Sequence, residues 1–146
     1  MSALRHLDIL LVDDDLGDCR LVQETLGKGK RVGKVTVVND GDEALAYLRN
    51  QGTHKKANRP DLVLLDLNMP RKDGFSTLQD IRADRGLSDL PVVILTTSTD
   101  EKDVQRSYRL HASCFVSKPT RLEDFARVMG EIEAFWGGTA RVPRPA

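Results

Sequence analysis

Short apolar runs alternate with longer segments of helical periodicity along the chain. The runs are rich in leucine and β-branched residues, and they predict strands at 7–12, 34–38, 62–65, 91–95 and 113–116. After each run, apolar residues recur at helical spacing and predict helices at 16–26, 44–48, 75–81, 100–110 and 121–136. This alternation predicts an α/β fold, a doubly wound parallel (βα)5 sheet with helices on both faces. If the strand order is 2-1-3-4-5, strands one and three flank the point where ligands bind.

The last predicted helix carries more apolar surface than packing against one sheet requires. A stripe of apolar residues and two flanking ones make up this surface: Leu122, Phe125, Met129, Ile132 and Trp136, with Val128 and Phe135 beside them. Either a partner covers the excess, or the tail folds back over it. The glycines and prolines of the tail predict an extended arm at 137–146, which follows a single domain at 1–136.

The composition is that of an ordinary globular domain with no excess of either charge. The chain has 146 residues, enough for one domain and too few for an added effector domain. Its 22 basic residues balance 22 acidic ones, which argues against nucleic-acid binding. The apolar runs are far shorter than the ~18 residues of a membrane span. Residues 1–6 lack a signal-peptide pattern, and Cys19 and Cys114 show no paired spacing, so we expect a cytoplasmic protein.

Charged and polar side chains stand at the carboxyl ends of four predicted strands. In an open α/β sheet these ends share one rim, where ligands bind. Asp14 and Asp15 could simply cap the first helix, and Thr96 and Lys118 could be ordinary strand-end and surface residues. Asp66, however, directly follows a fully apolar strand and has no helix to cap. Together the four ends offer the residue types of a phosphate site: Asp13, Asp14, Asp66, Asn68, Thr96 and Lys118.

The charges at this rim predict its chemistry. The carboxylates of Asp13, Asp14 and Asp66 would repel one another in one crevice unless a cation neutralised them. All-oxygen ligands favour Mg²⁺ over Zn²⁺, since no His or Cys stands at a strand end near them. An ionised aspartate can attack phosphorus without a general base, which makes Asp66 the predicted nucleophile. Lys118 would pair with one phosphoryl oxygen, and the Thr96 hydroxyl would donate to another.

The chain contains four spaced motifs: LLVDDD, DLNMPRKDG, ILTTS and SKP. Their spacing resembles that of the receiver domains of two-component response regulators. The resemblance extends from about residue 7 to residue 129. The resemblance implies a flavodoxin-like fold with Asp66 as phosphoacceptor. It implies that the metal ligands are Asp13, Asp14, Asp66 and the backbone carbonyl of Asn68.

The same resemblance assigns roles to residues later in the chain. Thr96 and Phe115 match the switch hydroxyl and the switch aromatic, and Lys118 matches the family's lysine. The Lys118–Pro119 bond matches a cis peptide, and Gly74 matches the glycine after the acceptor loop.

The polar insertion around 52–59 and the tail from 135 to 143 resemble single-domain regulators that pair with phytochrome-type histidine kinases. This resemblance implies a homodimer through the fourth and fifth helices, the fifth strand and the arm, which would use the apolar stripe described above. It also implies that the kinase is recognised by the first helix, 16–26, and by the loop at 119–121.

We therefore expect a phosphorylation switch and not an enzyme: its only chemistry would be its own phosphorylation by a histidine kinase and its dephosphorylation. Phosphorylation would repack the face formed by the fourth helix, fifth strand and fifth helix. One alternative is an interaction module that no longer uses phosphate. Another is a haloacid-dehalogenase-type phosphatase, but that site needs a second carboxylate two residues after the nucleophile, where this chain has Asn68.

Overall fold

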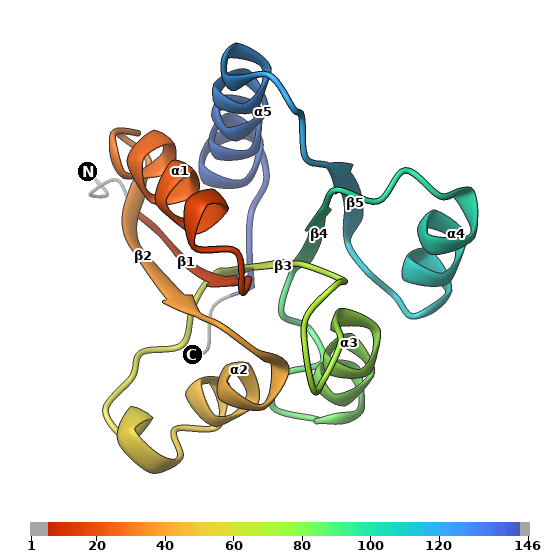
Figure 1. The fold of residues 1–146 in the computed structure, drawn as a ribbon. Helices are drawn as coiled ribbons and strands as arrows, with labels where there is room; N and C mark the ends of the chain where they lie inside the picture. The colour runs from red at the N-terminus through yellow and green to blue at the C-terminus, as the bar shows by residue number, and fades with distance from the viewer. Residues whose placement is uncertain (1–5, 144–146) are drawn as a thin grey trace.

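A computed structural model describes residues 6–143 and contains one parallel five-stranded sheet in the order β2-β1-β3-β4-β5 (Figure 1). This arrangement confirms the predicted α/β fold and strand order. The strands are β1 Leu7–Val12, β2 Val32–Val38, β3 Leu62–Leu65, β4 Val92–Thr96 and β5 Cys114–Ser117. The helices are α1 Leu16–Gly27, α2 Gly41–Leu48, α3 Gly74–Ala83, α4 Glu101–Arg109 and α5 Leu122–Ala134.

Each face of the sheet is covered by its own helices. On one face α1 and α5 pack side by side, and on the other α2 and α3 cover the sheet while α4 lies beside β5 (Figure 1). The central strands β3 and β4 are buried along their whole length, which explains their purely apolar sequences. No helix in residues 6–143 is both long and apolar enough to cross a membrane.

Four of the five helices begin with an aspartate cap. The side chains of these residues accept a hydrogen bond from a backbone amide in the first turn, at Asp15, Asp40, Asp73 and Asp100. Such caps satisfy amides that have no partner inside the helix. The capping interpretation is therefore correct for Asp15, whose Oδ1 accepts from the Asp18 amide at 3.0 Å.

The connection between α2 and β3 is fastened to the body by polar contacts. It contains a 3-10 turn at Gly52–His54. The side-chain amide of Asn50 donates to the carbonyl oxygen of Ala57 at 2.5 Å, which closes the loop. Arg59 donates to the Gly86 carbonyl and to the Asp89 carboxylate at 2.8 Å. These contacts join the insertion to the segment that follows α3.

The beginning of the predicted arm is helical rather than extended. A π-helical turn at Phe135–Thr139 continues α5, and the Ala140 amide donates to the Phe135 carbonyl at 2.6 Å. The expectation of an extended arm from residue 137 is wrong because glycine weakens a helix without ending one, and the prolines come later. Gly137 and Gly138 also lie against Arg31, where a Cβ at Gly137 would come within 2.9 Å of the Arg31 Cβ.

Beyond this turn the chain is extended and returns to the body. Val142 is partly buried against the apolar core under α1 and α5. Leu122 and Phe135 stay 62% and 50% exposed. Residues 144–146, the end of the expected arm, and residues 1–5, most of the segment without a signal-peptide pattern, lie outside the described residues.

Candidate functional site

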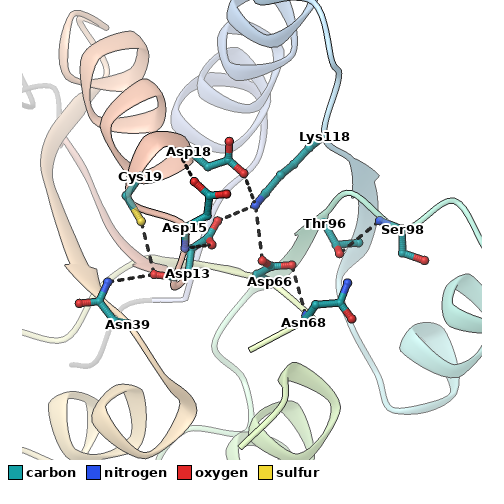
Figure 2. Close-up of polar contacts among 10 residues, drawn as sticks. All are labelled: Asp13, Asp15, Asp18, Cys19, Asn39, Asp66, Asn68, Thr96, Ser98 and Lys118. Carbon is teal, nitrogen blue, oxygen red and sulfur yellow. Dashed lines mark hydrogen bonds and ion pairs between the residues drawn. The ribbon is translucent and has the colours of Figure 1, made fainter. Parts of the chain in front are cut away.

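The rim formed by the carboxyl ends of the strands brings the predicted acidic residues and the lysine together (Figure 2). Asp13 follows β1 and Asp66 follows β3 directly, and these strands are neighbours with Val12 opposite Leu65. The two aspartates therefore leave the sheet side by side. Lys118 follows β5 and reaches back over the end of β4 to meet them.

Three carboxylates converge at this rim. Asp13, Asp14 and Asp66 each offer one oxygen, and these oxygens all lie within 4.8 Å of one another. Asp13 and Asp66 are buried, whereas Asp14 is exposed. Burial raises the pKa of Asp13 to about 6, although hydrogen bonds from Lys118 and from the Asp15 amide oppose this shift. Three hard oxygen donors with surplus negative charge, two of them buried, fit a divalent cation.

The Asn68 backbone lies next to the predicted phosphoacceptor. Its amide points to the Asp66 side chain, with 3.4 Å between nitrogen and Oδ1. This contact places residue 68 at the edge of the carboxylate cluster. Its carbonyl remains a predicted metal ligand.

Lys118 is the buried counter-charge of the cluster. Its Nζ lies 2.6 Å from Asp13 Oδ2, 2.8 Å from Asp18 Oδ2 and 3.5 Å from Asp66 Oδ2 (Figure 2). Burial alone would lower the pKa of Lys118, but the hydrogen bonds to Asp13 and Asp18 and the charge of Asp66 outweigh it and raise the pKa. The ammonium group therefore keeps its charge in the absence of any ligand.

The structure adds three residues to the site that we did not predict from the sequence. Asp18 binds Lys118, while the Asn39 amide and the Cys19 thiol donate to the Asp13 carbonyl oxygen at 3.0 and 3.4 Å. The spacing of Asp18 from the Asp15 cap, three residues, puts it on the first turn of α1 and could have pointed to it. Burial, and next the charge of Asp13, raise the pKa of Cys19 to about 11, so this thiol is protonated at neutral pH.

Thr96 is connected to the start of α4. It is fully buried, and its hydroxyl oxygen accepts a hydrogen bond from the Ser98 amide at 3.4 Å. The Ser98 hydroxyl in turn donates to Asp103 Oδ2 on α4 at 2.6 Å. A change in the Thr96 hydroxyl is thereby linked through two hydrogen bonds to the position of this helix.

Phe115 and α4 are held together at the edge of the sheet. The Phe115 amide donates to the Tyr108 hydroxyl at 3.2 Å, and its ring packs partly buried against the core under α2 and α3. On its other side, α4 is held to α3 because the Arg106 guanidinium lies 4.2 Å from the centre of the Phe75 ring. The hydrogen bond between Phe115 and Tyr108 and the contact of Arg106 with Phe75 together hold α4 in its present position.

The Lys118–Pro119 bond is trans, as are all peptide bonds of residues 6–143, so the expected cis bond is wrong. With the trans bond, the Lys118 amide donates to the Thr96 carbonyl at 2.6 Å while its Nζ reaches the carboxylates. The trans isomer of such bonds is favoured by about 0.5–1 kcal/mol in general, and these contacts do not require the other isomer.

Gly74 fixes the loop that follows Asp66. A Cβ at this position would clash with the backbone carbonyl of Asp66, and the Gly74 amide donates to the Leu67 carbonyl at 3.0 Å. The start of α3 therefore packs directly on the backbone of the acceptor loop, an approach that only glycine allows.

Buried carboxylates, a lysine and a strand-end threonine on a 2-1-3-4-5 sheet define the class of phosphoacceptor signalling domains. The model of the response regulator receiver domain matches residues 9–129, and the chain belongs to this family. This membership decides against the phosphatase alternative.

Two response regulators of similar length match nearly the whole chain. Response regulator Rcp1 of Synechocystis sp. is 43% identical over 135 residues, which is 92% of each chain. The structure of the phosphorylated cyanobacterial phytochrome response regulator RcpA has a TM-score of 0.91 at 45% identity, covering 95% of this chain and 99% of the other. The Mn²⁺-bound form of Rcp1 has a TM-score of 0.89 at 42% identity, covering 94% and 99%.

Proposed function

We propose that Asp66 accepts a phosphoryl group from the phosphohistidine of a phytochrome-type histidine kinase, with Mg²⁺, and that this switches the contacts of the chain. One observation carries the proposal: the buried Asp66 carboxylate lies within 4.8 Å of ligand oxygens of Asp13 and Asp14 and 3.5 Å from the Lys118 ammonium. The phosphorylated and Mn²⁺-bound states named for the two structural relatives are consistent with it.

The residues at the rim divide the chemistry among them. Asp13, Asp14, Asp66 and the Asn68 carbonyl would hold Mg²⁺, which when bound offsets charge on the transferring group. A carboxylate oxygen of Asp66 attacks phosphorus, the P–N bond to the imidazole breaks as the P–O bond forms, and the imidazole leaves. The Lys118 ammonium pairs with a phosphoryl oxygen. Return to the resting state is hydrolysis of the acyl phosphate, so the chain turns over no separate substrate.

Output would follow from the hydrogen-bonded connection between Thr96 and α4. When the Thr96 side chain turns to donate its hydroxyl to a phosphoryl oxygen, the oxygen that accepts from the Ser98 amide moves, and the Ser98–Asp103 bond passes the movement to α4. Phe115 then follows, because its amide is bound to Tyr108 of the same helix. The readout of the chain would be a changed protein contact at α4, β5 and α5.

A hollow beside the phosphoacceptor would admit the kinase. It has a volume of about 450 Å³ and lies between the start of α1 and the loop after β5, with Asp18, Lys118 and Pro119 among its lining residues. Leu16, on the neighbouring first turn of α1, is 76% exposed. An apolar rim around a charged centre suits a helical partner that presents one histidine. The name of RcpA, a phytochrome response regulator, supports a kinase of the phytochrome type.

Two free thiols and a net charge of zero support a reducing cytoplasm and a protein partner rather than a nucleic acid or a membrane. Both cysteines are described, and Cys19 is buried. The output of the chain would be contact with another protein, as expected for the single-domain regulators that it resembles.

A homodimer would use the part of the apolar stripe that the chain does not bury itself. Phe125, Met129 and Ile132 lie in the core of the chain, so the predicted interface narrows to the residues outside it. These are Leu122, Val128, Phe135 and Trp136, of which Leu122 and Phe135 are exposed. A groove of about 320 Å³ borders Val128, Phe135 and Trp136 and would receive apolar side chains of a second copy.

Sedimentation velocity tests the homodimer. We expect the intact chain to sediment as a dimer at micromolar concentration, and removal of residues after Trp136 to weaken the dimer because the turn that braces Phe135 is lost. Phe135→Lys in the intact chain should do the same without truncation. The matched control is Leu16→Lys, an exposed apolar residue on α1. A monomer at several hundred micromolar would contradict the proposed dimer.

Phosphorylation by a small donor tests the proposed function. We expect incubation with phosphoramidate and Mg²⁺ to add the mass of one phosphoryl group to the intact chain, and chelation of the metal with EDTA to prevent it. Intact-mass spectrometry measures both. A chain that stays unmodified with phosphoramidate and with acetyl phosphate would instead support a module that no longer uses phosphate.

A further inference from the structure

We propose that Asp18 is a positioning residue that holds the Lys118 ammonium away from Asp66 and so competes with the phosphoryl group for it. The inference rests on the proposed function of Asp66. It concerns a residue on α1 that belongs neither to the three-carboxylate cluster nor to the predicted switch.

The distances around Lys118 show where its ammonium is held. Its Nζ has charge-assisted hydrogen bonds of 2.6 and 2.8 Å to Asp13 and Asp18, whereas Asp66 is 3.5 Å away (Figure 2). An ammonium has three donors, and two of them are directed to the α1 side of the crevice. The third contact, to Asp66 Oδ2 at 3.5 Å, is the longest, so a closer contact with a phosphoryl group on Asp66 would draw the ammonium against the two short bonds.

Asp18 differs from Asp13 in how it would respond to a bound cation. Asp13 belongs to the carboxylates whose oxygens converge within 4.8 Å, so a cation would share its negative charge. Asp18 is not one of these three residues, and it keeps its full charge for Lys118 when the cluster is loaded. During phosphoryl transfer, therefore, it is mainly Asp18 that competes with the phosphoryl group for the Lys118 ammonium.

The fold gives Asp18 a fixed place. Its amide donates to the Asp15 cap at 3.0 Å, which sets the first turn of α1, and its side chain is about one quarter exposed, at 26%. Lys118 is held from the other end, because its amide is bound to the Thr96 carbonyl at the end of β4. The ion pair therefore bridges α1 and the loop after β5, and both of these elements line the hollow beside Asp66.

The matched pair of variants is Asp18→Asn and Asp15→Asn. Both remove one negative charge from the same turn, and asparagine serves as well as aspartate at a helix cap. No hydrogen bond or ion pair joins the Asp15 side chain to Lys118 among the described contacts. Asp18→Asn leaves a neutral amide oxygen beside the ammonium, so the geometry is kept while the competition weakens.

Two binding measurements follow from this design. At saturating Mg²⁺, we expect Asp18→Asn to bind beryllium trifluoride, a phosphoryl mimic that bonds to an aspartate, about fivefold more tightly than the wild type. We expect the same variant to bind Mg²⁺ itself about fivefold more weakly, because the freed ammonium moves toward the cluster. Asp15→Asn should change both constants by less than about twofold. Structural damage would weaken the binding of both ligands, so opposite shifts of the two affinities indicate that the Lys118 ammonium has moved.

A double-mutant cycle separates this role from a general effect of charge. In a Lys118→Met background, Asp18→Asn should leave the affinity for beryllium trifluoride unchanged, because no ammonium is left to compete for. An effect that persists without Lys118, or equal affinities of wild type and Asp18→Asn, would overturn the role of Asp18 alone. A wild type that binds neither Mg²⁺ nor the mimic would overturn the proposed function and this inference with it.

Discussion

Replacing Asp66 with asparagine is expected to abolish phosphorylation of the chain by phosphoramidate and by a histidine kinase. The amide has the shape of the carboxylate but lacks the anionic oxygen that attacks phosphorus, so we expect the rate to fall at least about a hundredfold. The loss has no structural origin, because the variant removes one of three mutually repelling carboxylates and leaves Lys118 paired with Asp13 and Asp18. Intact-mass spectrometry over a time course measures the rate.

Asp15→Asn is the matched control for this variant. Asp15 lies two residues after Asp13 on the same rim, yet its side chain caps α1 and it is not one of the three clustered carboxylates. We expect this control to be phosphorylated at nearly the wild-type rate. Undiminished labelling of Asp66→Asn would move the acceptor to another residue.

Replacing Asp13 with asparagine is expected to stabilise the metal-free chain at neutral pH. Burial raises the pKa of this carboxyl from 3.8 to about 6, so its charge is less favourable in the folded chain than in the unfolded one. The charged carboxyl therefore lowers the free energy of unfolding at pH 7 relative to a neutral side chain in its place. Denaturant unfolding followed by circular dichroism, with EDTA present, measures the difference between variant and wild type.

The stabilisation by Asp13→Asn should depend on pH in a defined direction. Well below pH 3.8 the carboxyl is protonated in both states of the wild type, and the charge has no effect on folding. As the pH rises to about 6, the unfolded chain loses this proton first, and the folded chain is progressively penalised. The advantage of the variant should therefore be near zero at about pH 3, grow between about pH 4 and pH 6, and level off above it.

Magnesium should remove most of the stability advantage of Asp13→Asn. At 100 times its dissociation constant a ligand adds about 2.7 kcal/mol to the stability of the folded state. We expect this gain for the wild type and little of it for Asp13→Asn, which lacks one clustered carboxylate. A variant that is less stable than the wild type at pH 7.5 without metal would contradict the electrostatic account of the crevice.

The fold could be predicted from the sequence because its signals are local. Fully apolar runs such as Leu62–Leu65 mark strands covered on both faces, and that prediction is confirmed to the residue. The start of β2 was set two residues late, at Lys34, because Gly33 interrupts the β-branched pattern. The helical turn at Phe135–Thr139 was missed because it depends on glycine packing against Arg31, more than a hundred residues earlier.

The sequence predicts those site residues that directly follow a strand. Asp13, Asp66 and Lys118 are placed at one rim by topology alone, since each directly follows a strand of the same sheet. Asp18 and Asn39 were not found, because their contacts depend on which way a side chain turns. The spacing from Asp15 puts Asp18 on the first turn of α1, but the Lys118–Asp18 pair joins residues 100 positions apart, and nothing in the sequence indicates that contact.

The extent of the proposed dimer face shows a third limit of sequence-based prediction. Periodicity identifies which residues of α5 are apolar but not which of them the core of the chain already uses. Phe125, Met129 and Ile132 are buried under α1 and β-strand residues, and Leu122 on the same stripe is 62% exposed. Only the packing of α5 against α1 separates these two sets.

Locating the added phosphoryl group tests the central claim most directly. Borohydride reduces an aspartyl phosphate to homoserine, which tandem mass spectrometry identifies by position. After phosphorylation of the wild type with Mg²⁺ and phosphoramidate, we predict homoserine at position 66 and at no other aspartate. Homoserine elsewhere, or a borohydride-resistant phosphoryl group on His6, His54 or His111, would contradict the account.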